Sequence, residues 1–142
     1  MVPEEFPAPT SGGLSPGGRT NREGVLRMIL VVDDEPDLAR GLARILKSRG
    51  FDVVIAEGGI QAVELFRKHH PQAMLTDIKM PDMDGLALSR EIKRIDPGAA
   101  VIFMTGYSDS EREALEEGAV AVLRKPLDYS LLFQILGQLG FA

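Results

Sequence analysis

Five short apolar runs alternate along the chain with longer segments whose apolar residues recur at helical spacing. The runs cover about residues 27–32, 51–56, 73–77, 100–104 and 120–124. Several show little alternation of apolar and polar positions, which is typical of parallel strands covered by helices on both faces. After the first run, Leu38, Leu42 and Leu46 fall on one helical face. The pattern predicts an α/β protein in which five strands alternate with five helices.

The helix limits follow from acids, prolines and glycines between the runs. The predicted helices begin near Pro36, Gly59, Leu86, Ser110 and Asp128, and the fourth covers only about residues 110–117. Because acids favour a helix start, we expect Asp34 to contribute to capping the first helix. Right-handed crossovers between parallel strands then give a doubly wound sheet.

Polar residues follow four of the predicted strands directly. They are Asp33 and Asp34, Asp77, Thr105, and Lys125. Ligands of doubly wound sheets bind beyond the carboxyl ends of the strands. We therefore expect these side chains to share one crevice.

Three carboxylates in one crevice repel one another, by about 4 kcal/mol per pair at ~4 Å and an effective dielectric of ~20. A raised pKa, separation or a bound cation can relieve this repulsion, and an all-oxygen set favours Mg²⁺. Asp33 and Asp34 could merely cap the following helix, but capping needs only one acid and does not explain Asp77. Asp77 is the candidate nucleophile for a phosphoryl group, and Lys125 and Thr105 are candidates for holding its oxygens. Taken singly, Lys125 could be a solvated side chain and Thr105 a turn-forming hydroxyl.

Composition limits the classes of protein. The 142 residues suit one domain, and the absence of cysteine excludes disulfides and thiolate metal sites. A net charge of −5 without a long basic run makes nucleic-acid binding unexpected, and no apolar stretch approaches the ~20 residues of a membrane helix. Without an apolar leader, a cytoplasmic location is expected. Proline and glycine in residues 1–24 predict a disordered tail, which leaves residues 25–142 as the domain.

Four segments in order resemble the receiver domain of bacterial two-component response regulators, and the likeness extends over about residues 27–140. The segments are residues 29–36, 75–85, 101–107 and 118–126. The resemblance implies the flavodoxin-like strand order 2-1-3-4-5. It also implies an aspartate that is phosphorylated by a sensor histidine kinase or a phosphotransfer protein. The domain itself would help to catalyse this reaction and its own slow dephosphorylation.

Carried over position by position, the resemblance gives each site residue a role. Asp77 would be the phosphoacceptor and a Mg²⁺ ligand, Asp34 would bind Mg²⁺ directly, Asp33 would bind it through water, and the backbone carbonyl of Lys79 would complete the set. Thr105 and Lys125 would contact the phosphoryl oxygens.

Neighbouring positions also receive implied roles. The Lys125–Pro126 bond would be cis, Gly106 would leave room for the phosphoryl group, and Tyr107 would lie beside the pocket. Two departures stand out: Val122 occupies a position that is usually aromatic, and the stretch between Thr105 and Lys125 is short. A conventional threonine–aromatic switch is therefore not expected, and the short fourth helix should be the loosest element.

We expect a signalling switch that acts through the face formed by the fourth helix, fifth strand and last helix. Because the chain ends soon after Lys125, we expect its output to be an unidentified partner protein, or the chain to be one piece of a larger phosphorelay. A homodimer is also possible. Three alternatives remain: a phosphatase with an aspartate nucleophile, a flavin-binding module of the same fold, and a receiver-like interaction module that is never phosphorylated. The phosphatase would leave Asp77 idle, and a flavin module would need a Ser/Thr/Gly loop after the first strand.

Overall fold

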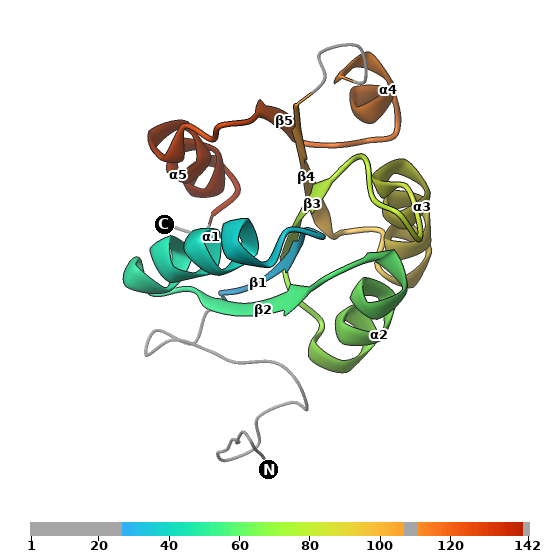
Figure 1. Ribbon diagram of the computed structural model, residues 1–142, viewed down its shortest axis with the longest axis horizontal. Helices are drawn as coiled ribbons and strands as arrows, with labels where there is room; N and C mark the ends of the chain where they lie inside the picture. Colours follow the sequence, from blue (N-terminus) through green and yellow to red (C-terminus); the bar gives the residue numbers. More distant parts are fainter. Residues whose placement is uncertain (1–26, 107–110, 141–142) are drawn as a thin grey trace.

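A computed structural model describes residues 27–106 and 111–140, which form one parallel sheet between two layers of helices (Figure 1). The strands are β1 (Met28–Val32), β2 (Asp52–Ala56), β3 (Ala73–Asp77), β4 (Ala100–Thr105) and β5 (Ala121–Arg124). The helices are α1 (Pro36–Ser48), α2 (Gly59–His69), α3 (Gly85–Ile95), α4 (Glu111–Glu116) and α5 (Tyr129–Gln138). The strand order is β2-β1-β3-β4-β5 and all pairs are parallel. The predicted doubly wound α/β fold is confirmed.

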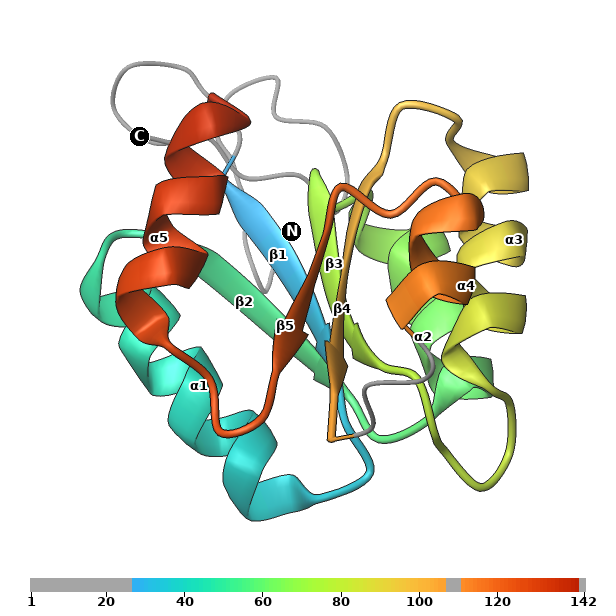
Figure 2. The same ribbon diagram turned by 90° about the horizontal axis from the view of Figure 1, so that it is seen from above.

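Two hydrophobic clusters hold the layers together, one on each face of the sheet. Helices α1 and α5 cover one face, and α2, α3 and α4 cover the other (Figure 2). The central strand β1 supplies both clusters, because Ile29 and Val31 point to the first and Leu30 and Val32 to the second. Every residue of β1 is buried. This two-sided burial explains why the strand has no alternating polar positions.

The strand register brings the carboxyl ends of the strands to one edge. Val32 of β1 pairs with Thr76 of β3, Asp77 pairs with Met104, and Thr105 pairs with Arg124. The residues that follow β1, β3, β4 and β5 therefore emerge beside one another, as the sequence predicted.

The start of α1 differs from the prediction. Glu35 occupies the N-cap position and its side chain accepts no capping hydrogen bond. Instead, Asp33 Oδ1 accepts a hydrogen bond from the Glu35 backbone N–H, at 2.9 Å. The expectation that Asp34 contributes to capping this helix was therefore wrong, because the carboxylate that accepts from the backbone here is that of Asp33.

The other differences are small. Strand β5 begins at Ala121, one residue later than predicted, and α4 has six residues, with Ala114 as its buried residue. The predicted tail at residues 1–24, Tyr107, and Ser110 at the predicted start of the fourth helix lie outside the described residues. Within the described ranges, no helix combines the length and the apolar character needed to cross a membrane.

Candidate functional site

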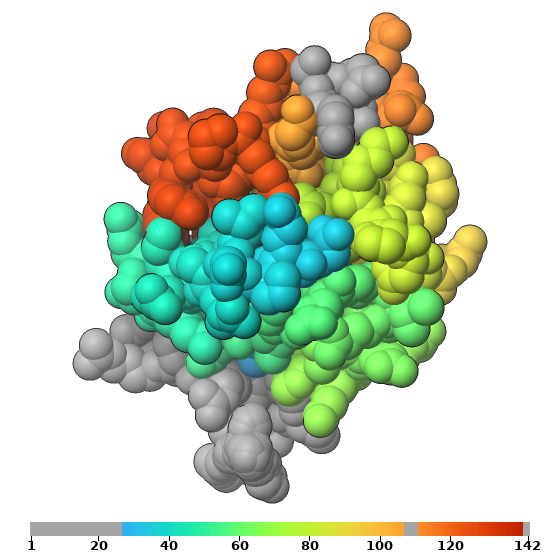
Figure 3. Space-filling view, viewed as in Figure 1, coloured from blue at the N-terminus to red at the C-terminus, as the bar shows by residue number. Residues whose placement is uncertain are grey.

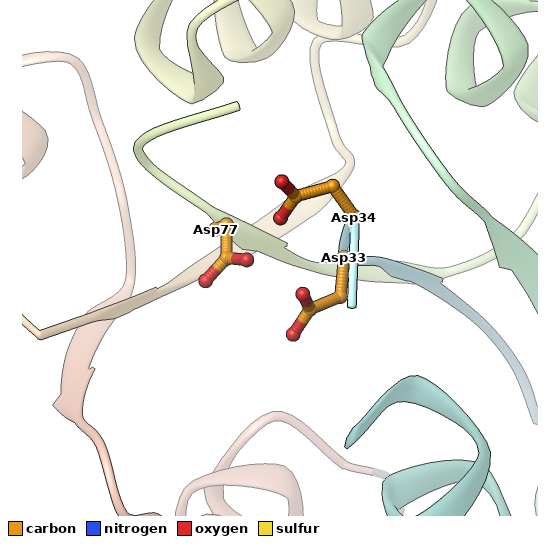
Figure 4. A group of neighbouring side chains, drawn as sticks. All are labelled: Asp33, Asp34 and Asp77. Carbon is orange, nitrogen blue, oxygen red and sulfur yellow. The ribbon is translucent and has the colours of Figure 1, made fainter. Parts of the chain in front are cut away.

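Three carboxylates gather where β1 and β3 end. Asp33 and Asp34 follow β1, and Asp77 closes β3, the neighbouring strand, so that their side chains are directed toward a common space (Figure 4). One oxygen from each of the three lies within 4.8 Å of the others. Asp33 and Asp77 are buried, whereas Asp34 is exposed. The cluster thus combines a buried floor with one carboxylate open to solvent.

Lys125, which follows β5, reaches this cluster from the other side of β4. Its Nζ lies 2.6 Å from Asp77 Oδ1 and 3.2 Å from Asp33 Oδ2, and Glu35 Oε1 is 3.8 Å away. The backbone N–H of Lys125 donates to the Thr105 carbonyl at 2.9 Å, which continues the pairing of β4 with β5. The Lys125–Pro126 bond is cis, as the resemblance implied. A single ammonium group thus contacts both buried carboxylates.

The titration of Asp77 reflects its crowded surroundings. Burial, together with the hydrogen bond and repulsion from Asp33, raises the pKa of Asp77 to about 7, although Lys125 opposes the rise. Burial lowers the pKa of Lys125, but its contacts with Asp77 and Asp33 outweigh this and raise the pKa overall. Lys125 therefore stays protonated at neutral pH, while Asp77 is only partly ionised without a further cation.

The segment after Asp77 is folded closely against it. The Gly85 N–H donates to the Ile78 carbonyl at 2.7 Å. A Cβ atom at Gly85 would overlap the Asp77 carbonyl oxygen. Asp84 Oδ1 then caps α3 by accepting from the N–H groups of Leu86 and Ala87, at 2.6 and 3.2 Å. Glycine is required at position 85 because the chain returns to the acidic cluster at this point.

The remaining predicted positions surround the cluster. Thr105 is buried at the end of β4, and a Cβ atom at Gly106 would meet no described atom within 4 Å. Lys79 is exposed in the segment between β3 and α3. Val122 is partly buried, pairs in register with Phe103 and packs against the cluster beneath α2, α3 and α4. A short aliphatic side chain therefore fills the position that is usually aromatic.

Two contacts were not predicted from the sequence. Glu35 lies near Lys125, and Asp82 caps α2 from the segment that follows Asp77. The first could have been inferred from the position of Glu35 just after the two aspartates. The second joins residues 22 and 23 positions apart, and its only signal in the sequence is the Gly58–Gly59 pair.

The donor atoms suit a hard divalent cation. All three side-chain donors are carboxylate oxygens, which Mg²⁺ prefers, and no cysteine occurs in the sequence. The excess of negative charge also fits a cation, because Lys125 is the one ammonium among the described contacts of the two buried carboxylates. The residues present therefore fit Mg²⁺.

Comparison with known proteins identifies the family. The family model of the response regulator receiver domain matches residues 29–137. The chain belongs to this family, and it contains a receiver domain of the kind found in two-component response regulators.

Individual relatives agree with this assignment. A response regulator receiver protein of Anaeromyxobacter sp. is 46% identical over 104 residues, which cover 72% of this chain and 44% of that protein. The transcriptional regulatory protein ZraR of Escherichia coli K12 is 42% identical over 106 residues, which cover 73% of this chain and 24% of ZraR. The matched region thus spans less than half the length of these curated relatives.

Solved structures show the same fold. A response regulator receiver domain protein from Clostridium thermocellum superimposes with a TM-score of 0.76 at 33% identity, covering 80% of this chain and 93% of that one. A chain in the CheX–CheY–BeF₃–Mg²⁺ complex from Borrelia burgdorferi gives a TM-score of 0.76 at 29% identity, covering 85% and 95%.

Proposed function

We propose that this receiver domain is a phosphorylation switch in which Asp77 accepts a phosphoryl group from a phosphohistidine. The donor would be a sensor histidine kinase or a phosphotransfer protein of a two-component system or phosphorelay, acting in the cytoplasm. The observation that carries the proposal is the contact of Lys125 Nζ with Asp77 Oδ1, at 2.6 Å, inside the acidic cluster. A structural aspartate would not need two further carboxylates beside it.

The chemistry requires an ionised Asp77. One carboxylate oxygen attacks phosphorus, an O–P bond forms, the P–N bond of the donor breaks, and its electron pair stays on the imidazole nitrogen. Lys125 opposes the charge on Asp77 before transfer and can follow the phosphoryl oxygens afterwards as a mobile point charge. Thr105 lies buried at the end of the adjacent strand, and in this proposal its hydroxyl would donate to one of those oxygens.

Asp33, Asp34, Asp77 and the Lys79 carbonyl would hold Mg²⁺ in this proposal. When bound, Mg²⁺ supplies positive charge to the oxygens of the transferring group. Burial and the neighbouring Asp33 disfavour the ionised form of Asp77 and raise its pKa to about 7. A bound cation would favour the ionised form. Asp33 is held in place by its hydrogen bond from the Glu35 backbone.

The output is proposed to use the face formed by α4, β5 and α5. Exposed apolar side chains occur on or next to these elements, namely Leu115 on α4, Val120 just before β5, and Tyr129 and Leu131 on α5. Helix α4 joins this face with one buried residue, Ala114, and an ion pair at 3.5 Å between Glu111 and Arg124, next to Lys125. A change at Lys125 can therefore bias the position of α4, and the partner would be a downstream protein or a second copy of the domain.

Phosphorylation of the intact chain by acetyl phosphate and Mg²⁺ tests the proposal. We expect a mass increase of one phosphoryl group that is stable to acid and labile to base, and its loss in Asp77→Asn or in EDTA. Asp37→Asn is the matched control, because Asp37 is a highly exposed acid on α1 whose described ion pair is to Arg40. It should be labelled like the wild type.

The main alternative is a receiver-like module that acts without phosphorylation, which Val122 favours because it replaces the usual aromatic residue. Labelling that survives in Asp77→Asn would assign the acceptor to another residue. A chain that binds Mg²⁺ but is never labelled would support the alternative.

A further inference from the structure

We propose that Asp82 is a positioning residue for the cation site: by capping α2, it fixes the loop that carries the Lys79 carbonyl. The loop comprises residues 78–84, between β3 and α3, and it is called the acceptor loop below. The inference rests on the proposed function, because it assumes that Lys79 contributes to a Mg²⁺ site. It assigns a role to a residue outside the acidic cluster.

Asp82 caps α2 with both of its carboxylate oxygens, which accept hydrogen bonds from the first two residues of that helix. Asp82 Oδ1 accepts from the Gly59 N–H at 3.0 Å, and Oδ2 accepts from the Ile60 N–H at 3.1 Å. These two bonds lower the pKa of Asp82. Residue Gly58, at the N-cap position of α2, offers no side chain of its own. The start of α2 is therefore satisfied by the acceptor loop, which lies against it in the space-filling view (Figure 3).

Two glycines leave the space that this contact needs. A Cβ atom at Gly58 would lie 2.8 Å from both carboxylate oxygens of Asp82, and one at Gly59 would lie 2.7 Å from the Cβ of Met83. The backbone at Gly58 is extended, with φ of −170° and ψ of 176°, a conformation that any residue can adopt. Glycine at position 58 is therefore explained by the approach of Asp82 and not by backbone strain.

Asp82 is one of several contacts that hold the acceptor loop, whose Met80 and Met83 also pack against the hydrophobic cluster beneath α2, α3 and α4. At its start, the Ile78 N–H donates to the Met104 carbonyl at 3.3 Å. At its end, Asp84 caps α3. Lys79 lies between the anchor at Ile78 and the anchor at Asp82, and it is exposed. Without Asp82, the segment from Lys79 to Met83 would have more conformations available, and its carbonyl would be less often in place for a cation.

The expected effect is on Mg²⁺ affinity. Groups that orient metal ligands typically change affinity about 10–100-fold when they are removed. Because Asp82 acts through the loop and does not touch the ligand atom, we expect about a 10-fold rise in the dissociation constant, at the low end of that range. Asp82→Asn keeps one acceptor oxygen and should recover most of the affinity.

Calorimetric titration of the unphosphorylated full chain with MgCl₂ measures this directly. Asp82→Ala should weaken binding about 10-fold. Asp128→Ala is the matched control, because Asp128 caps α5 through the Leu131 N–H at 3.2 Å and lies outside the acceptor loop. It should lower the thermal stability by a similar amount and leave Mg²⁺ affinity unchanged. Equal weakening in both variants would make Asp82 merely structural and overturn the inference.

Gly58→Ala breaks the same contact from the other side. Its added methyl group would lie 2.8 Å from both carboxylate oxygens of Asp82 and would displace them from the α2 N–H groups, so we expect it to weaken Mg²⁺ binding like Asp82→Ala. In a protein that already carries Asp82→Ala, the methyl group has room and should cause no further loss. Losses that multiply in the double variant, or full affinity in Asp82→Ala, would overturn the inference.

Asp34→Asn distinguishes a failure of the Asp82 role from a failure of the proposed cation site. Suppose that the wild type binds Mg²⁺, that Asp34→Asn does not, and that Asp82→Ala binds as tightly as the wild type. This result would reject the role of Asp82 and keep the proposed cation site. Wild-type binding that is absent, or unaffected by Asp34→Asn, would reject the site itself and the inference with it.

Discussion

Replacing Asp77 by asparagine should stabilise the cation-free fold, although Asp77 makes a close ion pair. The carboxylate is buried beside Asp33, and its pKa is raised from 3.8 to about 7 by burial first and by Asp33 second. A carboxyl group whose pKa is higher in the folded state binds its proton more tightly there. Its ionisation at higher pH therefore costs stability. An asparagine side chain at this position would have a similar shape and no charge, so this cost would be absent.

The size of the effect follows from the pKa change. A rise from 3.8 to about 7 corresponds to a cost of about 4 kcal/mol when Asp77 is fully ionised. The cost begins to develop above the unfolded value, near pH 4, and is complete above about pH 7. About 3 kcal/mol of it develops between pH 5 and pH 8. Over that range Lys125 stays protonated, because its pKa is raised above the ordinary value.

Urea unfolding in EDTA at pH 5 and pH 8 measures the effect. The advantage of Asp77→Asn over the wild type in the free energy of unfolding should increase by about 3 kcal/mol from pH 5 to pH 8. Because the two proteins are compared at the same pH, the contributions to stability of other groups that titrate alike in both proteins cancel. An advantage that stays constant with pH, or falls as pH rises, would refute the assignment of the raised pKa to Asp77.

Mg²⁺ should narrow the difference in stability between the wild type and Asp77→Asn. At 100 times its dissociation constant, a ligand that binds only the folded state adds about 2.7 kcal/mol of stability. Wild-type protein should gain this at pH 8, whereas Asp77→Asn has lost one carboxylate ligand and should gain less.

Three further predictions concern single contacts. Lys125→Ala should slow labelling by acetyl phosphate about 100-fold or more, measured as the rate of mass increase, and an unchanged rate would exclude the ammonium from the reaction. Gly85→Ala should lower the free energy of unfolding by about 3 kcal/mol, because the new Cβ would overlap the Asp77 carbonyl oxygen; urea unfolding at the wild-type value would show that the loop relaxes freely. Phe66→Ala should cost about 3–5 kcal/mol in the same assay, because Phe66 is fully buried under the sheet, and a loss below about 1 kcal/mol would mean that the core collapses around it.

The fold was predictable because its three central strands, β1, β3 and β4, are buried on both faces. A residue such as Leu30 or Val31 must be apolar whichever way it points, so each strand stands out as a continuous apolar run. Helix α4 was harder to delimit, since it has six residues and Ala114 alone is buried. A short helix with so little burial leaves a weak periodic signal.

The site was predictable as a group of residues but not in its details. Parallel strands bring Asp33, Asp77 and Lys125 to one edge whatever the side-chain geometry, so their meeting followed from the fold class. Which of two adjacent aspartates accepts the Glu35 N–H depends on the direction of each side chain where the strand ends, and composition cannot decide it. The same holds for Asp82, whose partner at Gly59 is distant in sequence.

A crystal structure of the chain with Mg²⁺ would test the central claim most directly. We predict one ion at about 2.0–2.1 Å from carboxylate oxygens of Asp34 and Asp77 and from the Lys79 carbonyl oxygen, with Lys125 still beside Asp77. An ion bound elsewhere, or an acidic cluster that remains without an ion at saturating Mg²⁺, would contradict the account.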